Sequence, residues 1–286
     1  MSKLPMSYFQ RRNYLINVFK DSMARIEQSA ELNDATQNSI RTQQFIPASA
    51  DIVSNTPQKD TVARVIVSRN RSFEAARPYA EQGYKVTVLN FASFTNPGGG
   101  VTSGSSAQEE CLCRVSNLYP CLKDQHMWDS FYAPHRKAAN PLHNDDIIYT
   151  KDIRVFKDDD YALIDKPFTV DIITCAAPTL REQASNRYNP SDGDKAPTLT
   201  PEELCALHEQ RGRKILATAA ANGADVIILG AFGCGAFKND PTIVAQAYAN
   251  ILPEYLRYFH TIEFAIYCSA SSAQNYQAFS ATFQSF

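Results

Sequence analysis

The residues Gly98-Gly99-Gly100 and Gln108-Glu109-Glu110 form the chemically most informative part of this sequence, with seven residues between them. Consecutive glycines let backbone N–H groups approach an anion closely, in conformations that other residues avoid. Adjacent carboxylates offer one proton donor and one hydrogen-bonding neighbour. This order of residues is typical of a catalytic site in which an anion-accepting loop precedes an acid pair.

A second glycine-containing segment, Gly233-Cys234-Gly235-Ala236-Phe237, follows an apolar stretch and precedes a helix start at Asp240-Pro241. Aligned N–H dipoles in such a loop can hold a diphosphate without lysine or arginine. A single Gly-x-Gly turn between a strand and a helix is more often only structural. Together with the first loop, this segment favours a diphosphate site.

Composition sets limits on partners. The chain has 286 residues, 44% of them hydrophobic, which is enough for a globular core. A net charge of -2 gives no long-range attraction for a polyanion, so phosphate recognition must be local and no sequence-specific nucleic-acid binding is expected. No stretch reaches the roughly 18 apolar residues of a membrane span.

The cysteines and the N-terminus bear on the compartment of the protein. Seven cysteines and the absence of a signal-peptide pattern predict a reduced intracellular protein, cytoplasmic or, in a eukaryote, nuclear.

Hydrophobic periodicity predicts an α/β architecture in two parts. Residues 1–60 are expected to form an N-terminal helical extension, with an amphipathic helix over 8–30 and a partly irregular connector over 31–60. Residues 61–286 are expected to form the catalytic domain. Strands are predicted at 63–68, 85–93, 147–156, 169–177, 225–232 and 261–269, and helices at 71–82, 201–221, 240–256 and the C-terminus. Residues 120–145 and 181–200 are interpreted as surface excursions.

The segment 90–118, NFASFTNPGGGVTSGSSAQEECLCRVSNL, resembles the poly(ADP-ribose) glycohydrolase family, whose signature is GGG, six to eight residues, then QEE. The segments ARVIVSRNRSFEAA, CLCRVSNLY, VFKDDD, VDIITCAAP, GAFGCGAFKNDP and FAIYCS resemble its microbial branch in the same order. The resemblance covers about residues 60–280 and implies a macrodomain-like mixed sheet flanked by helices. Two departures are Tyr149-Thr150-Lys151-Asp152, where the family pattern has a Ser-Pro turn, and a lengthened loop at 181–200.

The resemblance also implies an activity, namely hydrolysis of ribose–ribose O-glycosidic bonds in poly(ADP-ribose) or on ADP-ribosylated proteins, releasing ADP-ribose from chain ends without a cofactor. By resemblance Glu110 is the general acid that then activates water, and Glu109 binds a ribose hydroxyl. Gln108 would support the ligand or the acid pair. Burial and nearby negative charge are expected to raise the pKa of a glutamate in such a cleft.

The binding residues are predicted from the two loops. Gly98, Gly99, Gly100 and the following Val101 should line the distal ribose and phosphates, and Gly233, Cys234, Gly235, Ala236 and Phe237 should wrap the diphosphate. Phe237 is predicted to stack on adenine, with an ordinary core aromatic as the alternative. Asn90 and Asn96 are candidate ribose partners by polarity alone, and Asn96 before Pro97 is equally compatible with a turn.

The same residues are also compatible with other roles. Glu109 and Glu110 could be ordinary first-turn helix residues, if the glycines did not precede them. The same pocket would serve a mono-ADP-ribosyl hydrolase, and the glycine loops alone would serve a non-catalytic ADP-ribose reader, which would not need both acids. Cys111, Cys113, Cys121 and His126 lack typical zinc spacing, so no metal is expected, and Cys234 has no adjacent base. The acidic run 158–160 is interpreted as a solvated loop.

Overall fold

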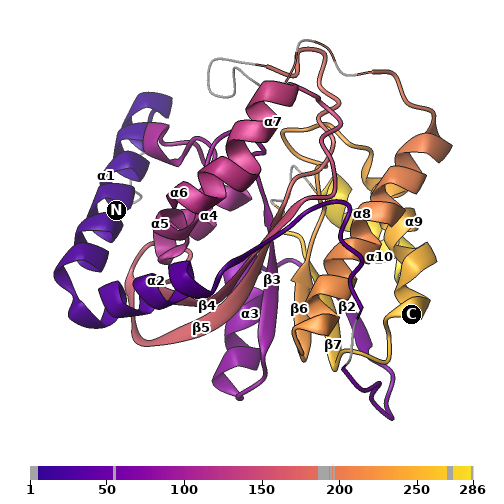
Figure 1. The fold of residues 1–286 in the computed structure, drawn as a ribbon, viewed down its shortest axis with the longest axis horizontal. Helices are drawn as coiled ribbons and strands as arrows, with labels where there is room; N and C mark the ends of the chain where they lie inside the picture. Colours follow the sequence, from indigo (N-terminus) through magenta and orange to yellow (C-terminus); the bar gives the residue numbers. More distant parts are fainter. Residues whose placement is uncertain are drawn as a thin grey trace.

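The protein folds around one seven-stranded mixed sheet (Figure 1). The structure is a computed structural model that describes residues 6–53, 56–185, 193, 195, 197–268, 273–284 and 286. The strands run in the order β1 (Gln44–Ile46), β4 (Ile147–Lys157), β5 (Leu163–Cys175), β3 (Val86–Phe91), β6 (Val226–Leu229), β7 (Thr261–Ala265) and β2 (Arg64–Ser68). β1 and β4 pair antiparallel, as do β4 and β5, whereas β5 to β2 are mutually parallel. The carboxyl ends of these parallel strands therefore share one edge, where open α/β sheets place their ligands.

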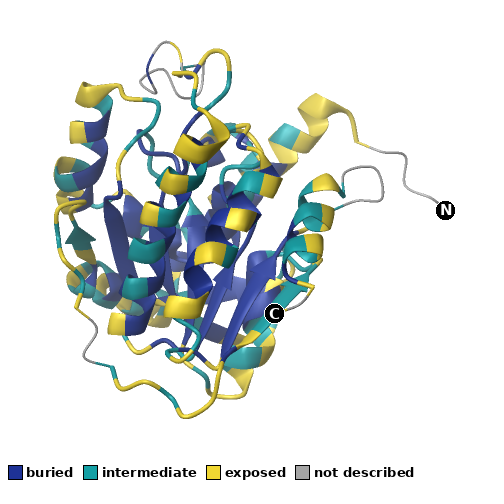
Figure 2. Cartoon of the chain, turned by 90° about the vertical axis from the view of Figure 1, so that its right-hand side faces the viewer, coloured by how far each residue is buried: buried dark blue, intermediate teal, exposed yellow. Residues whose placement is uncertain are grey.

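Helices cover both faces of the sheet (Figure 1), and their inner sides are buried while their outer sides are exposed (Figure 2). One face carries α1 (Tyr8–Gln28), α2 (Ala30–Thr42), α3 (Ser72–Glu81), α4 (Gln108–Val115), α5 (Leu118–Leu122), α6 (Gln125–Met127), the π-helical turn η2 (Trp128–Tyr132) and α7 (Ala133–Ala138). The other carries α8 (Pro201–Ala221), α9 (Pro241–Ile251) and α10 (Gln274–Thr282). Short 3₁₀ turns lie at η1 (Val101–Ser103) and η3 (Leu252–Glu254). This layered mixed sheet confirms the predicted fold class.

The start of α8 shows how local sequence fixes an element. The Thr200 hydroxyl accepts a hydrogen bond from the Glu203 N–H at 3.2 Å, and the Glu203 carboxylate accepts one from the Thr200 N–H at 2.8 Å. Two N–H groups without helical acceptors are thereby satisfied, and Pro201 occupies the first helical position, where no N–H is needed. The predicted capping box is confirmed.

The prediction of an irregular connector over 31–60 is wrong for its first half. This region forms α2 and the edge strand β1, which pairs with β4. The buried residues of α2 are Thr36 and Ser39, so the helix has no apolar stripe for periodicity to detect. Hydrogen bonds stabilise its inner face instead, from Asn117 Nδ2 to Thr36 Oγ1 at 3.0 Å and from Ser39 Oγ to the Asp152 carbonyl at 3.2 Å.

The prediction that residues 120–145 are a surface excursion is also wrong. The segment forms the end of α5 and a continuous helical run over 125–138, in which Phe131 and Tyr132 are fully buried. Phe131 packs on Phe94 with ring centroids 4.9 Å apart, and His135 packs on Phe94 at 4.0 Å. Residues 125–138 form one continuous helical run, but its middle, Trp128–Tyr132, is π-helical and departs from the 3.6-residue period, which explains the error. The predicted loop at 181–200 lies partly outside the described residues.

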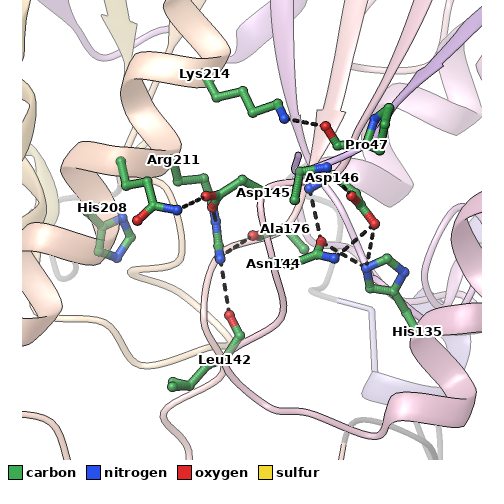
Figure 3. A network of polar contacts seen from close by, with 12 residues as sticks. Pro47, His135, Leu142, Asn144, Asp145, Asp146, Ala176, His208, Arg211 and Lys214 are labelled. Carbon is green, nitrogen blue, oxygen red and sulfur yellow. Dashed lines mark hydrogen bonds and ion pairs between the residues drawn. The ribbon is translucent and has the colours of Figure 1, made fainter. Parts of the chain in front are cut away.

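A buried polar network joins α8 to the loops behind the carboxyl edge (Figure 3). The Arg211 guanidinium, only 2% exposed, donates from Nε to Asp145 Oδ1 at 2.8 Å. It also donates from Nη1 to the Ala176 carbonyl at 2.7 Å and from Nη2 to the Leu142 carbonyl at 3.2 Å. Because a charge-assisted set of this kind fixes three segments at once, the chain just after β5 is held in place.

Candidate active site

A cavity of about 420 Å³ opens at the carboxyl edge of the parallel strands. We call it the main cavity. Its wall combines the residues that follow β3, the first turn of α4, the loop after β6 and the chain after β7. Lining residues include Ser93, Gly99, Gln108, Glu109, Glu110, Ala177, Phe232, Gly233, Gly235, Ala236, Phe237, Ile266 and Tyr267. Both glycine-containing motifs therefore meet in one concave site of ligand size.

Glu110 lies at the boundary between the main cavity and a second one. The second cavity, of about 370 Å³, is lined by Tyr8, Arg11, Arg12, Leu15, Gly100, Gly104, Ser105, Ser106, Ala107, Glu110, Arg181 and Ala236. Glu110 Oε1 accepts a hydrogen bond from the Gly100 N–H at 2.8 Å. Within the described part of the chain, the buried Oε2 atom has no hydrogen-bond partner. One carboxylate oxygen is thus fixed by the glycine loop, and the other is left for a ligand.

Glu109 is buried more deeply, at 3% exposure, and its carboxylate accepts hydrogen bonds from β3 and from the chain just after that strand. Its Oε2 accepts from the Ser93 N–H at 2.7 Å, and its Oε1 accepts from Asn90 Nδ2 at 3.3 Å. Burial raises the pKa of Glu109 well above its ordinary value, and the charge of Glu110 raises it further, although the hydrogen bonds from Ser93 and Asn90 act in the opposite direction. The two acids therefore sit in different environments despite being neighbours.

The glycines allow the loop to close around these acids. Gly99 has φ +57°, and a Cβ there would lie 2.6 Å from Glu110 Oε1 and 3.0 Å from Glu109 Oε2. Gly98 has φ +67°, and a Cβ there would meet the Tyr119 ring at 2.7 Å. Any side chain at these positions would displace the carboxylates or the ring, so the run of glycines is required by close approach.

Gln108 ties the acid-bearing helix to the sheet. Its side-chain Nε2 donates to the Leu89 carbonyl at 2.7 Å and to Ser72 Oγ at 3.0 Å, and its Oε1 accepts from the Phe91 N–H at 2.9 Å. The Gln108 amide is therefore engaged with the end of β3, although it also borders the main cavity. Of its two predicted roles, these contacts favour support of the acid pair.

The loop after β6 presents free backbone donors to the main cavity. Among the described residues, the N–H groups of Gly235, Ala236 and Phe237 donate to no protein acceptor. The loop itself is anchored by Asn239, whose Nδ2 donates to the Pro178 carbonyl at 2.7 Å and to the Gly233 carbonyl at 3.1 Å. Convergent N–H groups without internal partners are suited to bind phosphate oxygens.

The Asn239 amide is in turn oriented by His208 of α8, with Nε2 2.8 Å from Asn239 Oδ1. Because Asn239 Nδ2 donates to carbonyls, its Oδ1 must accept, so His208 Nε2 carries the proton. Burial lowers the pKa of His208 to about 4. The neutral imidazole thus belongs to the support of the phosphate loop.

Several residues of the rim were missed by sequence reasoning. Arg71 donates to the Asp159 carbonyl at 2.8 Å, and its guanidinium lies 4.3 Å from the centroid of the Tyr267 ring. All three border the main cavity, so the interpretation of 158–160 as only a solvated loop is wrong for Asp159. Burial raises the pKa of Asp159 to about 6. Tyr267 follows β7 and lies in the segment FAIYCS, so both its position after a strand end and the resemblance were available signals.

The predicted site residues divide into two groups. Gly99, Gln108, Glu109, Glu110, Gly233, Gly235, Ala236 and Phe237 border the main cavity, and Gly100 borders the second. Asn90, Asn96, Gly98, Val101 and Cys234 border neither. Asn90 is fully buried beneath Glu109, Val101 belongs to the core, and Asn96 accepts from Arg136 at 3.0 Å. The Cys234 thiol donates to the Phe232 carbonyl at 3.7 Å, and burial raises its pKa.

The aromatic side chains of the C-terminal helix lie away from the main cavity. Phe279 and Phe283 are buried in the core, and Tyr276 packs against Arg69 at 4.6 Å. From this region Tyr267 and Asn275 reach the cavity wall instead. In the described residues, no three His, Cys, Asp or Glu side chains gather to hold a metal ion, and no helix is long and apolar enough to cross a membrane.

Comparisons with known proteins agree with this geometry. The family model for the microbial-type PARG catalytic domain, PARG being poly(ADP-ribose) glycohydrolase, matches residues 17–158. The solved poly(ADP-ribose) glycohydrolase from Thermomonospora curvata is 28% identical, with a TM-score of 0.82 over 95% of this chain and 100% of that one. Its complex with the inhibitor ADP-HPD gives 28% identity and a TM-score of 0.80 over 94% and 99%.

The enzyme from Deinococcus radiodurans in complex with ADP-ribose is 29% identical, with a TM-score of 0.72 over 87% of this chain and 97% of that one. No curated protein matches the sequence. The motif, the fold and the acid pair beneath a glycine loop agree with the family match. This chain belongs to the microbial-type poly(ADP-ribose) glycohydrolase family.

Proposed function

We propose that this protein hydrolyses the ribose–ribose O-glycosidic bonds of poly(ADP-ribose) and releases ADP-ribose, with Glu110 as the acid and base. The observation that carries the assignment of Glu110 is its position. One oxygen is fixed by the Gly100 N–H, and the other is buried without a protein partner at the boundary of two cavities. A scissile bond has one sugar on each side, so a group between two cavities is suitably placed to act on it.

The proposed reaction needs one proton shuttle. The reactive form of the acid pair is the one in which Glu110 carries the proton, and Glu110 donates it to the bridging oxygen as the bond to the anomeric carbon breaks, which neutralises the departing alkoxide. The resulting Glu110 carboxylate then takes a proton from a water molecule as that water attacks the anomeric carbon. Glu110 ends the cycle protonated, and both products carry a hydroxyl group.

A two-sided acid pair does not fit this site. Glycosidases that use two carboxylates place them on opposite sides of the sugar, roughly 5 to 9.5 Å apart. Here one carboxylate oxygen of each glutamate lies within 3.0 Å of a single point, the position that a Cβ on Gly99 would occupy, so the two acids lie on the same side of the site. Glu109 is therefore assigned to orient a ribose hydroxyl, and its buried contacts with Ser93 and Asn90 support a positioning role.

The main cavity is proposed to hold the terminal ADP-ribose unit. The free N–H groups of Gly235, Ala236 and Phe237 suit its diphosphate, and Phe237 is assigned to stack on the adenine. Phe237 is half-buried and borders the cavity, as a stacking residue must. The Deinococcus radiodurans relative binds ADP-ribose, which supports this assignment. We infer cleavage from chain ends, one unit at a time.

Incubation with an automodified poly(ADP-ribosyl)ated acceptor tests the proposal, with products separated by size. Wild-type protein should release ADP-ribose, and Glu110→Gln should leave the polymer intact. Accumulation of intermediate oligomers before ADP-ribose would contradict cleavage from ends. Intact polymer with tight ADP-ribose binding by the wild type would instead favour a mono-ADP-ribosyl hydrolase or a reader.

A further inference from the structure

The second cavity is a built structure and not a gap between loose elements. A Cβ on Gly104, which has φ +76°, would lie 2.5 Å from the Arg12 carbonyl oxygen, so the loop after η1 lies directly on the backbone of α1. The Arg12 guanidinium closes the same contact by donating from Nε to the Ser103 carbonyl at 2.9 Å. The N-terminal helix therefore forms one wall of the cavity.

The loop 100–107, which contributes to the same cavity, is fixed by a residue of α4. Arg114 is fully buried and donates from Nη1 to the Ser105 carbonyl at 2.7 Å and from Nη2 to the same oxygen at 2.5 Å. Two charge-assisted hydrogen bonds on one carbonyl hold the loop 100–107 beside Glu110. The cavity is thus preformed by contacts from two helices.

The charge of this wall differs from that of the whole protein. Arg11, Arg12 and Arg181 border the second cavity, and Glu110 is the one acidic residue of its lining. The chain as a whole carries a net charge of -2. A local set of guanidinium groups in a concave site favours a ligand with phosphate groups.

The second cavity is also bordered by an exposed aromatic ring. Tyr8 borders the second cavity and is 66% exposed, which is unusual for a large aromatic side chain. Its hydroxyl accepts a hydrogen bond from Arg12 Nη1 at 3.2 Å, so the ring is held by a neighbour on the same helix. An exposed and oriented ring beside arginines is a typical surface for stacking a nucleobase.

We propose that the second cavity binds the ADP-ribose unit on the leaving-group side of the cleaved bond, with Tyr8 stacking on its adenine and Arg11 contacting its diphosphate. The proposal rests on the proposed function, because that function places the scissile bond at Glu110. The sugar on the leaving-group side is an adenosine ribose. The adenine and the diphosphate of that unit are attached to this ribose, so both must lie close to the cleaved bond. The buried Glu110 Oε2, which has no protein partner among the described residues, lies where the two units would join.

A comparison of two ligands tests this subsite. Affinities for ADP-ribose and for an ADP-ribose dimer are measured in the Glu110→Gln background, where neither ligand is consumed. We expect the dimer to bind roughly tenfold more tightly, the scale of one charge-assisted hydrogen bond or one stacked base. Tyr8→Ala and Arg11→Ala should each reduce this ratio severalfold, whereas Tyr8→Phe should keep it.

Lys20→Ala is the matched charge control, since Lys20 is exposed on the same helix and borders neither cavity. It should leave the ratio unchanged. Because Arg11 borders both cavities, the ratio and not the dimer affinity alone is the readout.

Equal binding of dimer and ADP-ribose in the background variant would overturn the subsite, as would a ratio that neither Tyr8→Ala nor Arg11→Ala changes. An ADP-ribosylated acidic peptide serves as a third ligand, and a preference for it over the dimer would also overturn the proposal. A failure of the proposed function would give a different result from a failure of the subsite proposal. Wild-type protein would then leave polymer uncut, whatever the affinity ratio.

Discussion

The two loops of the site differ in how closely their glycines are packed. Around the acid pair the chain is closed, because a Cβ on Gly99 would lie 2.6 Å from Glu110 Oε1. The loop after β6 is closed at Gly233, where a Cβ would lie 2.5 Å from the Ala177 side chain, but open at Gly235, where a Cβ would meet no heavy atom within 4 Å. Side chains that move protons are thus held by tight packing, whereas backbone groups that receive phosphate are left uncovered.

The anchors of the two loops follow the same division. Arg114 attaches the loop before the acid pair to α4, and Gln108 attaches α4 to the end of β3. Asn239 and His208 hold the phosphate loop from behind, within the buried layer under α8. Substitutions in the first loop should therefore affect catalysis, and those in the second should affect affinity or stability.

The largest effect is expected for Glu110→Gln, which removes the proton carried to the leaving oxygen. Turnover should fall by about 10² to 10⁴-fold, the usual contribution of general acid–base catalysis, while ADP-ribose affinity stays within a few-fold. Glu109→Gln should lower turnover less. Single-turnover kinetics and calorimetric titration measure the two quantities, and an equal loss of binding would contradict the acid role.

Gly99→Ala and Gly235→Ala form a matched pair across the two loops. Gly99→Ala puts a methyl group against both carboxylates at positive φ, so activity should fall on the order of 10²-fold through misplacement of the acids. Gly235→Ala has open space at that position and should change unfolding free energy by about 0.5 kcal/mol or less. Similar losses of activity in both variants would remove the distinction between the loops.

His208 should make stability depend on pH. Its pKa is about 4 in the folded protein and 6.5 ordinarily, so between these values the unfolded chain binds a proton that the folded chain does not. The contribution of His208 to the free energy of unfolding therefore has its full value above pH 6.5 and decreases by about 3 kcal/mol as the pH falls to 4. Urea unfolding at pH 7 and 4.5 measures the change. His208→Gln should show a smaller pH difference than the wild type.

Phe237→Ala should mainly weaken ligand binding. Loss of a stacked base costs roughly 1 to 3 kcal/mol of ADP-ribose affinity. Phe237→Tyr, which keeps a ring, is the control and should bind nearly as well as the wild type. An unchanged dissociation constant in Phe237→Ala would make Phe237 a packing residue only.

The smallest effect is expected from metal removal. Treatment with a chelator should leave activity unchanged, because the proposed reaction uses only protein groups and water. Inhibition by the chelator that added zinc reverses would contradict this and would indicate a metal site that involves Cys111, Cys113, Cys121 and His126.

Sequence patterns predicted the sheet better than the helices on its first face. The buried strand β6 is a continuous apolar run and β3 is mostly apolar and β-branched, so composition alone identifies them. Helix α2 buries threonine and serine, and the helical run 125–138 contains a π-helical turn that interrupts the 3.6-residue period. Tertiary contacts, and not local propensity, determine these elements.

The motifs located the site, but polarity did not identify the function of each side chain. Asn90 is a candidate ribose partner by polarity alone, and only the structure reveals that it is buried and that its amide donates to Glu109. Arg71 and Tyr267 lie within the resembling segments ARVIVSRNRSFEAA and FAIYCS, but the resemblance assigned them no role, and Arg11 lies outside those segments. Their assembly depends on sheet order, which a single sequence does not specify.

The contact between Gly104 and the backbone of Arg12 has a practical consequence for recombinant work. A fragment beginning near residue 60 would lose α1 and β1, so Leu15 and Phe19 would no longer cover the core and β4 would become an unpaired edge. Unpaired edges of this kind promote association between copies. Expression boundaries should therefore retain the N-terminal helix, and a purification tag belongs where it cannot obstruct Tyr8.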